Sequence, residues 1–170
     1  PIGTPTDDCW SFETTDLPEI LDGQFLVKVK YLSIDPAMRG WMNEGKSYIK
    51  PVGLGDVMRA LGIAEVIESK NEFYKVGDNV SGSFGVQEYA ISDGKDALKI
   101  ENTTLPLPVF LGTLGMSGLT AYFGILDTGQ PIEGETVVVS GAAGSVGSVV
   151  GQIAKIKGCR VVGIAGGEDK

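Results

Sequence analysis

Residues 137–158, VVVSGAAGSVGSVVGQIAKIKG, decide the fold of this chain. The first four residues are β-branched or small, which is typical of a short buried strand in a parallel sheet. Beyond the glycines the apolar side chains recur at helical spacing and predict one packing face, made of Val146, Val149, Val150, Ile153 and Ile156. Gly158 follows this helix and ends it. The stretch therefore predicts a strand, a glycine turn and a helix.

The turn between strand and helix carries a dinucleotide-binding pattern. Ala142-x-Gly144-x-x-Gly147 occupies the places of G-x-G-x-x-G, with alanine at the first glycine and Gly141 directly before it. Gly144 would let the backbone approach a pyrophosphate, and Gly147 would let the helix pack close to the strand. The free amide groups of the first helical turn would face the anion.

Glycines also cluster in ordinary turns, so the meaning of this pattern depends on its surroundings. It follows a strand, opens a helix and precedes a second apolar strand at residues 160–165, RVVGIA, which completes a βαβ unit. The phosphate loop of ATPases needs a lysine after its last glycine, whereas Ser148 follows Gly147 here. The sequence therefore predicts dinucleotide binding and argues against an ATPase.

The end of the second strand bears on the choice between NAD and NADP. NAD enzymes usually place an acidic residue there, about 20 residues beyond the fingerprint, to hold the ribose 2′-hydroxyl. This chain has Ala165, Gly166 and Gly167 instead, which leave room for a 2′-phosphate, and Lys170 supplies a cation. The alternative is that Lys170 is only a solvated charge, whose field the two acidic residues before it reduce. The sequence favours NADP.

Composition narrows the class of protein. The chain has 170 residues, of which 42% are hydrophobic and 21% charged, which is typical of a globular protein with one sizeable core or two modest ones. No run approaches the roughly 18 apolar residues of a membrane span, and no basic-then-apolar leader opens the chain, so we expect a cytoplasmic protein without membrane contact. The net charge of −8 argues against a nucleic-acid partner. Cys9 and Cys159 are expected to be reduced thiols.

The first part of the chain predicts β structure. Residues 25–31 alternate between apolar and wetter positions and predict a core face made of Phe25, Val27, Val29 and Tyr31. Further strands are predicted at residues 63–67, at the end of 75–82 and at 87–91. Short strands between such turns suggest a small barrel or sandwich. Residues 33–40 are predicted to form a loop or a short helical turn, because their proline disfavours helix at the residue before it.

A proline-rich linker at residues 103–108 separates this part from the nucleotide-binding unit. We therefore predict one domain at residues 1–108 and a second at 109–170. Residues 109–126 are apolar and long enough for one or two helices. Without further information, Met116, Tyr122 and Phe123 in this run are expected to be core residues.

Four segments together carry a family resemblance. They are residues 114–124 (LGMSGLTAYFG), residues 134–152 around the fingerprint, residues 33–40 (SIDPAMRG) and residues 76–78 (VGD). In these segments the chain resembles the zinc-free medium-chain dehydrogenase/reductases of the prostaglandin reductase and curcumin reductase group. The resemblance implies a GroES-like β-barrel domain followed by the first, βαβ half of a Rossmann domain. It also implies NADPH-dependent reduction of the C=C bond of an α,β-unsaturated ketone or aldehyde.

Zinc is not expected. A zinc alcohol dehydrogenase of the same superfamily needs Cys and His ligands around its catalytic metal, and this sequence has 0 His. Residues 34–36 and 59–62 stand where such relatives carry a Cys ligand and a Gly-His-Glu motif. Catalysis would then rest on the nicotinamide.

The resemblance also implies roles for single residues. Met116 and Thr120 would contact the cofactor near its nicotinamide. The pyrophosphate would be held by Gly144, Ser145, Val146 and Gly147, and the 2′-phosphate by Gly166 and Lys170. In the substrate pocket, Ala37 stands where many relatives carry an aromatic residue, and Tyr48 is the candidate to replace it.

A complete Rossmann domain needs about six strands, and this chain carries two of them. The proton-donating tyrosine of the family lies beyond Lys170, so the catalytic residues stay unknown and the chain is expected to be the inactive N-terminal half of a reductase. Two alternatives stay open: a quinone reductase on the same fold, and a non-catalytic NADP-binding relative. The partner is expected to be a small enone, and a homodimer is one option for the assembly.

Overall fold

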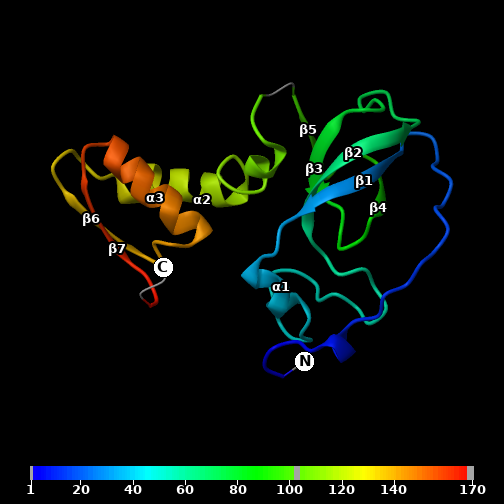
Figure 1. Cartoon of the computed structure of the whole chain (residues 1–170), viewed down its shortest axis with the longest axis horizontal. Coiled ribbons are helices and arrows are strands. Elements are labelled where there is room, and N and C mark those ends of the chain that lie inside the picture. The colour runs from blue at the N-terminus through cyan, green and yellow to red at the C-terminus, as the bar shows by residue number, and fades with distance from the viewer. Residues whose placement is uncertain (1, 102–103, 168–170) are drawn as a thin grey trace. The chain divides into compact units, whose positions relative to one another are not determined.

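The computed structural model describes residues 2–101 and 104–167. The chain divides into two compact units, Pro1–Thr104 and Leu105–Lys170 (Figure 1). This division lies within the proline-rich linker, a few residues before the boundary that the sequence predicts. Within the described ranges, no helix has the length and apolar character of a membrane span.

The first unit is built on one antiparallel sheet. Its strands are β1 (Phe25–Leu32), β2 (Leu61–Ser69), β3 (Asn79–Ser83), β4 (Tyr89–Ser92) and β5 (Ala97–Ile100), in the order β4-β1-β2-β3-β5. The first four strands lie where the sequence predicts strands. Strand β5 was not predicted from the sequence, because its four residues show no alternation of apolar and polar side chains. A 3-10 turn, η1 (Asp7–Cys9), precedes the sheet.

The core of this unit lies against the sheet. Its buried residues are Phe25, Val27, Ala64, Val66, Val80, Phe84, Ala90 and Ala97. The ring of Tyr74 stacks on that of Phe25 at 4.4 Å, and its hydroxyl donates to the carbonyl oxygen of Ala97 at 2.7 Å. The stacking and the hydrogen bond together attach the loop before β3 to the inner strand β1 and to the edge strand β5.

The predicted core face of β1 is wrong at its far end. Tyr31 is 44% exposed, whereas Leu26, predicted on the wetter face, is buried. The register between β1 and β2 shifts between Leu26 and Val27 and again between Val29 and Tyr31. Each such irregularity rotates the following side chains relative to the sheet, so strict alternation does not extend along the strand.

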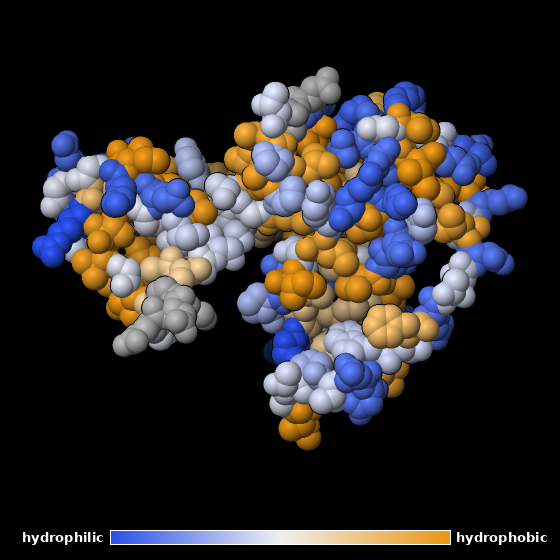
Figure 2. Space-filling view, in the orientation of Figure 1, coloured by the Kyte–Doolittle hydropathy of each residue, from blue (hydrophilic) through white to orange (hydrophobic). Residues whose placement is uncertain are grey.

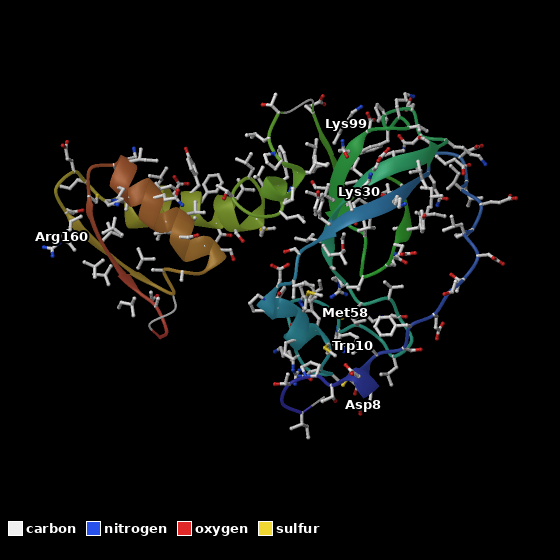
Figure 3. All side chains as sticks on the ribbon, in the orientation of Figure 1. Asp8, Trp10, Lys30, Met58, Lys99 and Arg160 are labelled. Carbon is white, nitrogen blue, oxygen red and sulfur yellow. The ribbon has the colours of Figure 1, made fainter. Side chains whose placement is uncertain are left out.

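Two partly exposed ion pairs connect elements of this unit; their lysines are labelled in Figure 3. Lys30 on β1 pairs with Glu65 on β2 at 2.6 Å, and Lys99 on β5 pairs with Asp78 at 2.7 Å. Asp78 also accepts a hydrogen bond from the backbone amide of Lys75 at 2.7 Å. Desolvation raises the pKa of Asp78, but the hydrogen bonds from Lys99 and Lys75 outweigh it and hold that pKa below its ordinary value.

After β1 the chain forms the short helix α1 (Pro36–Trp41), which resolves the choice that the sequence left between loop and helix. Pro36 stands at the first helical position, where a missing N–H costs nothing. Asp35 is extended and precedes the helix, and its amide donates to the sulfur of Met38 at 3.3 Å. A long loop then leads to β2.

The second unit contains the predicted βαβ element. Two short elements lead into it: η2 (Leu107–Phe110) and α2 (Met116–Phe123), with the π-helical turn η3 (Gly124–Gly129) directly after α2. Strand β6 (Thr136–Ser140) then lies parallel to β7 (Arg160–Ile164), and α3 (Ser145–Ile156) connects them. The predicted strand, glycine turn, helix and second strand are all confirmed.

The packing face of α3 differs from the predicted one. Ile156 is 84% exposed, whereas Ala154 is fully buried. The helix lies against the sheet through its small residues: a Cβ on Gly151 would touch Val161 at 3.6 Å. The core around it contains Ile125, Leu126, Val137, Val150, Ile153, Ala154, Cys159 and Val161. Ile156 is excluded because it lies on the opposite side of the last turn from Ala154.

Three large apolar residues of α2 are not core residues either, although Ala121 of the same helix is buried. Met116, Tyr122 and Phe123 are 66%, 51% and 52% exposed, so their prediction as core is wrong within this unit. Val138 on β6 and Ile164 on β7 are also more than half exposed, and hydrophobic surface is visible over this sheet (Figure 2). The sequence pattern shows which side chains of a helix or strand are apolar, but it does not show whether another helix or strand covers them.

Candidate functional site

An open hollow lies at the carboxyl ends of β6 and β7. Its volume is about 290 Å³, and it is lined by Gly141, Ala143, Gly144, Ala165 and Gly166. In parallel sheets with connecting helices, ligands bind outside the carboxyl ends of the strands. The structure therefore brings two predicted cofactor residues, Gly144 and Gly166, to the same hollow from distant parts of the sequence.

The wall formed by the fingerprint is a tight turn. Gly141 has φ of +60°, a conformation that side chains disfavour, and its carbonyl accepts a hydrogen bond from the amide of Gly144 at 2.8 Å. The next residue, Ala142, donates its amide to the carbonyl of Ile164 at 3.0 Å. Backbone hydrogen bonds thus close the turn and connect it to the end of β7.

Gly147 brings α3 up against this turn. A Cβ at this position would lie 2.4 Å from the carbonyl oxygen of Gly141 and 3.0 Å from the Cα of Ala142. Both atoms belong to the backbone and cannot rotate aside. The third glycine of the pattern is therefore required by close packing.

The start of α3 has the chemistry of an anion site. Gly144 is the N-cap, and no side chain caps the first-turn amides. The first turn, which begins with Ser145 and Val146, contains no acidic residue. Unsatisfied amides and the positive end of the helix dipole favour an anion there. The glycine turn, the open hollow and this helix start together fit the pyrophosphate of a dinucleotide.

The other wall is formed by the residues that follow β7. Ala165 and Gly166 carry little or no side chain, and a Cβ on Gly166 would meet nothing within 4 Å. Arg160 lies at the opposite, amino end of β7 and points outward (Figure 3), so it does not reach this wall. Lys170, predicted to meet a 2′-phosphate, lies outside the described residues.

The two predicted nicotinamide contacts lie on α2, which packs against α3. Met116 is the first residue of α2 and Thr120 lies one turn later on the same face. The hydroxyl of Thr120 donates to the carbonyl of Met116 at 2.7 Å, which leaves its oxygen free to accept a hydrogen bond. Neither residue lines the hollow.

The predicted substrate residues belong to the first unit. Ala37 is exposed on α1, and Tyr48 is 85% exposed. The indole N–H of Trp41 donates to the hydroxyl of Tyr48 at 3.4 Å, and the guanidinium of Arg59 lies 5.2 Å from the Trp41 ring centre. Arg59 also donates to the carbonyl of Lys50 at 3.1 Å. Sequence reasoning missed Trp41 and Arg59, although Arg59 stands in the segment that replaces the zinc-ligand motif.

The described part of the chain contains no cluster of potential metal ligands. No group of three or more His, Cys, Asp or Glu residues could hold an ion there. Both cysteines are free thiols. Cys159 is buried and its thiol donates to the carbonyl of Ile132 at 3.3 Å, so it serves the core of the second unit.

Comparisons with known proteins agree with this architecture. A family described as "N-terminal domain of oxidoreductase" matches residues 1–100. The chain is 52% identical to a putative NADP-dependent oxidoreductase, YfmJ, of Bacillus subtilis and 48% identical to the NADPH-dependent curcumin reductase of Escherichia coli. These alignments cover 100% of this chain but 50% and 49% of the relatives, so the chain spans about half the length of the curated relatives it matches.

A solved structure is also similar. CurA from Vibrio vulnificus in complex with NADPH superposes with a TM-score of 0.91 and 47% identity, over 99% of this chain and 50% of that one. These matches confirm the predicted fold class, a GroES-like β domain followed by the start of a Rossmann domain.

Proposed function

Because this chain belongs to the medium-chain dehydrogenase/reductase family, in the group of the curcumin and prostaglandin reductases, we propose that it is the N-terminal part of an NADPH-dependent double-bond reductase. The proposed substrates are α,β-unsaturated ketones and aldehydes. The observation that carries the proposal is the glycine-lined hollow at the carboxyl ends of β6 and β7, next to an uncapped helix start. The names of the relatives support the choice of reaction.

The chain's own residues would bind and orient the cofactor. Gly144 would let the backbone approach the pyrophosphate, and the amides of Ser145, Val146 and Gly147 at the start of α3 would hold it, since no side chain caps them. Gly166 would leave room for the 2′-phosphate, and Lys170 would pair with it. Met116 and Thr120 would contact the nicotinamide end. When bound, NADPH supplies the hydride that reduces the β-carbon of the enone.

The substrate would be bound by the first unit. Ala37 and Tyr48 are the proposed pocket residues, and Trp41 holds the Tyr48 hydroxyl through its indole N–H. The small side chain of Ala37 would leave space for a bulky substrate. The family tyrosine that donates the proton to the reduced enone would come from beyond Lys170.

The reaction can be tested with the intact protein and stereospecifically deuterated NADPH. We expect an enone to be consumed and the deuterium to be found on its β-carbon. Deuterium on the carbonyl carbon would instead show an alcohol dehydrogenase. Turnover of quinones without enones would show a quinone reductase, and NADPH binding without turnover on either class would show a non-catalytic relative.

The proposal includes independence from zinc, because the chain has no histidine and only two cysteines. Treatment with a strong chelator should leave the enone reductase activity unchanged, and metal analysis of the active protein should find no stoichiometric zinc. A cytoplasmic location and a homodimer stay predictions.

A further inference from the structure

We propose that Ala142 and Gly163 form a sterically matched pair that sets the distance between the two walls of the cofactor hollow. Gly163 is then a positioning residue for the dinucleotide. This inference rests on the proposed function, because it concerns the same hollow. It assigns a role to a strand residue that the fingerprint does not include.

The pair shares the space of one side chain. Gly163 lies on β7 opposite Val139 of β6, and a Cβ built on it would lie 2.8 Å from the Cβ of Ala142. No other atom beyond its chain neighbours would lie within 4 Å of that Cβ. The methyl group of Ala142 is therefore the single obstacle to a side chain at position 163, and something must shift if both positions carry one.

This contact lies where the two walls of the hollow meet. Ala142 stands between Gly141 and Ala143, which line the fingerprint wall, and its amide bonds to the carbonyl of Ile164 at 3.0 Å. Ile164 in turn precedes Ala165, which lines the opposite wall. A displacement of Ala142 from β7 would therefore lengthen this hydrogen bond and move the walls apart.

The turn would move more easily than the strand. Gly163 is held in the ladder between β6 and β7, whereas Ala142 is held to β7 through one backbone hydrogen bond. A methyl group added at position 163 should thus push the turn outward. In the usual fingerprint the first position of the turn is a glycine; in this chain the alanine there is accommodated by a glycine on the neighbouring strand.

The test compares Gly163→Ala, Ala142→Gly and the double variant Ala142→Gly/Gly163→Ala in the intact protein. Gly151→Ala is the matched control, because a Cβ there makes an ordinary contact of 3.6 Å. Two ligands are titrated into each: NADPH, which spans both walls, and adenosine 2′-monophosphate, which has the 2′-phosphate but no pyrophosphate.

We expect Gly163→Ala to raise the Kd for NADPH about 5- to 150-fold, the range that overpacking would produce. The Kd for adenosine 2′-monophosphate should change much less, and the double variant should bind NADPH within about threefold of the unmodified protein. A general loss of stability would weaken the binding of both ligands to a similar extent. Removal of the methyl group of Ala142 would not restore the binding in that case.

Three results would overturn the inference: unchanged NADPH binding in Gly163→Ala, equal losses for both ligands, or a double variant that stays as weak as the single one. If Gly163→Ala does not fold, recovery of folding and NADPH binding in the double variant supports the pair, and failure of both refutes it. An unmodified protein that does not bind NADPH would refute the proposed function itself.

Discussion

Gly147 offers a direct test of the dinucleotide site, because the structure leaves no space for a side chain there. In Gly147→Ala the new methyl group would lie 2.4 Å from the carbonyl oxygen of Gly141. Gly151→Ala places the same methyl group one turn later in α3, at an ordinary 3.6 Å from Val161. Both substitutions replace glycine by alanine within one helix, so the comparison isolates the steric clash.

The magnitudes follow from two effects of opposite sign. Alanine in place of an interior glycine stabilises a helix by about 1 kcal/mol. Overpacking costs about 1–3 kcal/mol, and here the clash is with backbone that also forms the hollow. Gly151→Ala should therefore be neutral or stabilising. Gly147→Ala should be destabilising and should raise the Kd for NADPH about 5- to 150-fold, because relief of the clash moves the helix start away from the turn.

Calorimetric titration with NADPH and thermal unfolding of both variants measure the two effects separately. The titration is made well below the unfolding midpoint, so that a loss of affinity reports on the site and not on unfolded protein. A folded Gly147→Ala variant that binds NADPH within about twofold of the unmodified protein would refute the steric argument. Equal losses in both variants would also refute it.

Three further predictions concern other parts of the chain. Lys170→Ala should reduce the preference for NADPH over NADH about 10- to 150-fold without changing the Kd for NADH, as measured by titration at two salt concentrations. Asp78→Asn should remove the stability that the ion pair with Lys99 provides above a pH of about 4. Urea unfolding at a series of pH values should show that the free energies of unfolding of the variant and the unmodified protein converge as the pH falls through the lowered pKa of Asp78. Gly118→Ala, whose methyl group would lie 1.7 Å from a backbone carbonyl oxygen, should destabilise the second unit strongly, whereas Gly124→Ala meets nothing within 4 Å at a position with helical backbone angles and should leave the unfolding temperature unchanged or raise it.

The parts of the fold that depend on neighbours in sequence could be predicted. β6, the glycine turn, α3 and β7 follow from a short apolar run, small residues and a helical period, all local properties of the chain. Gly144 and Gly166, which the sequence assigns to a cofactor site, both line the hollow at these carboxyl ends, and their cofactor role stays a prediction.

The parts that depend on packing could not be predicted in this way. The hydrophobic period of α3 selected Ile156, which is exposed, and passed over Ala154, which is fully buried. A search for helical periodicity selects the most hydrophobic side chains. A helix that packs closely on a sheet needs small side chains at the contact instead. The bulges that turn Tyr31 outward likewise depend on the partner strand and leave no mark in the sequence of β1.

The alanine in the fingerprint shows the same limit at the site itself. By sequence alone, Ala142 is a departure from the pattern and weakens it. In the structure its methyl group occupies the space that a side chain on Gly163 would need, so the departure is accommodated on another strand. The glycines of the motif are needed where little space is left beside the turn. The residues that limit this space can be distant in sequence. In this chain the residue that faces the altered position is Gly163, and its missing side chain leaves the space that the methyl group of Ala142 occupies.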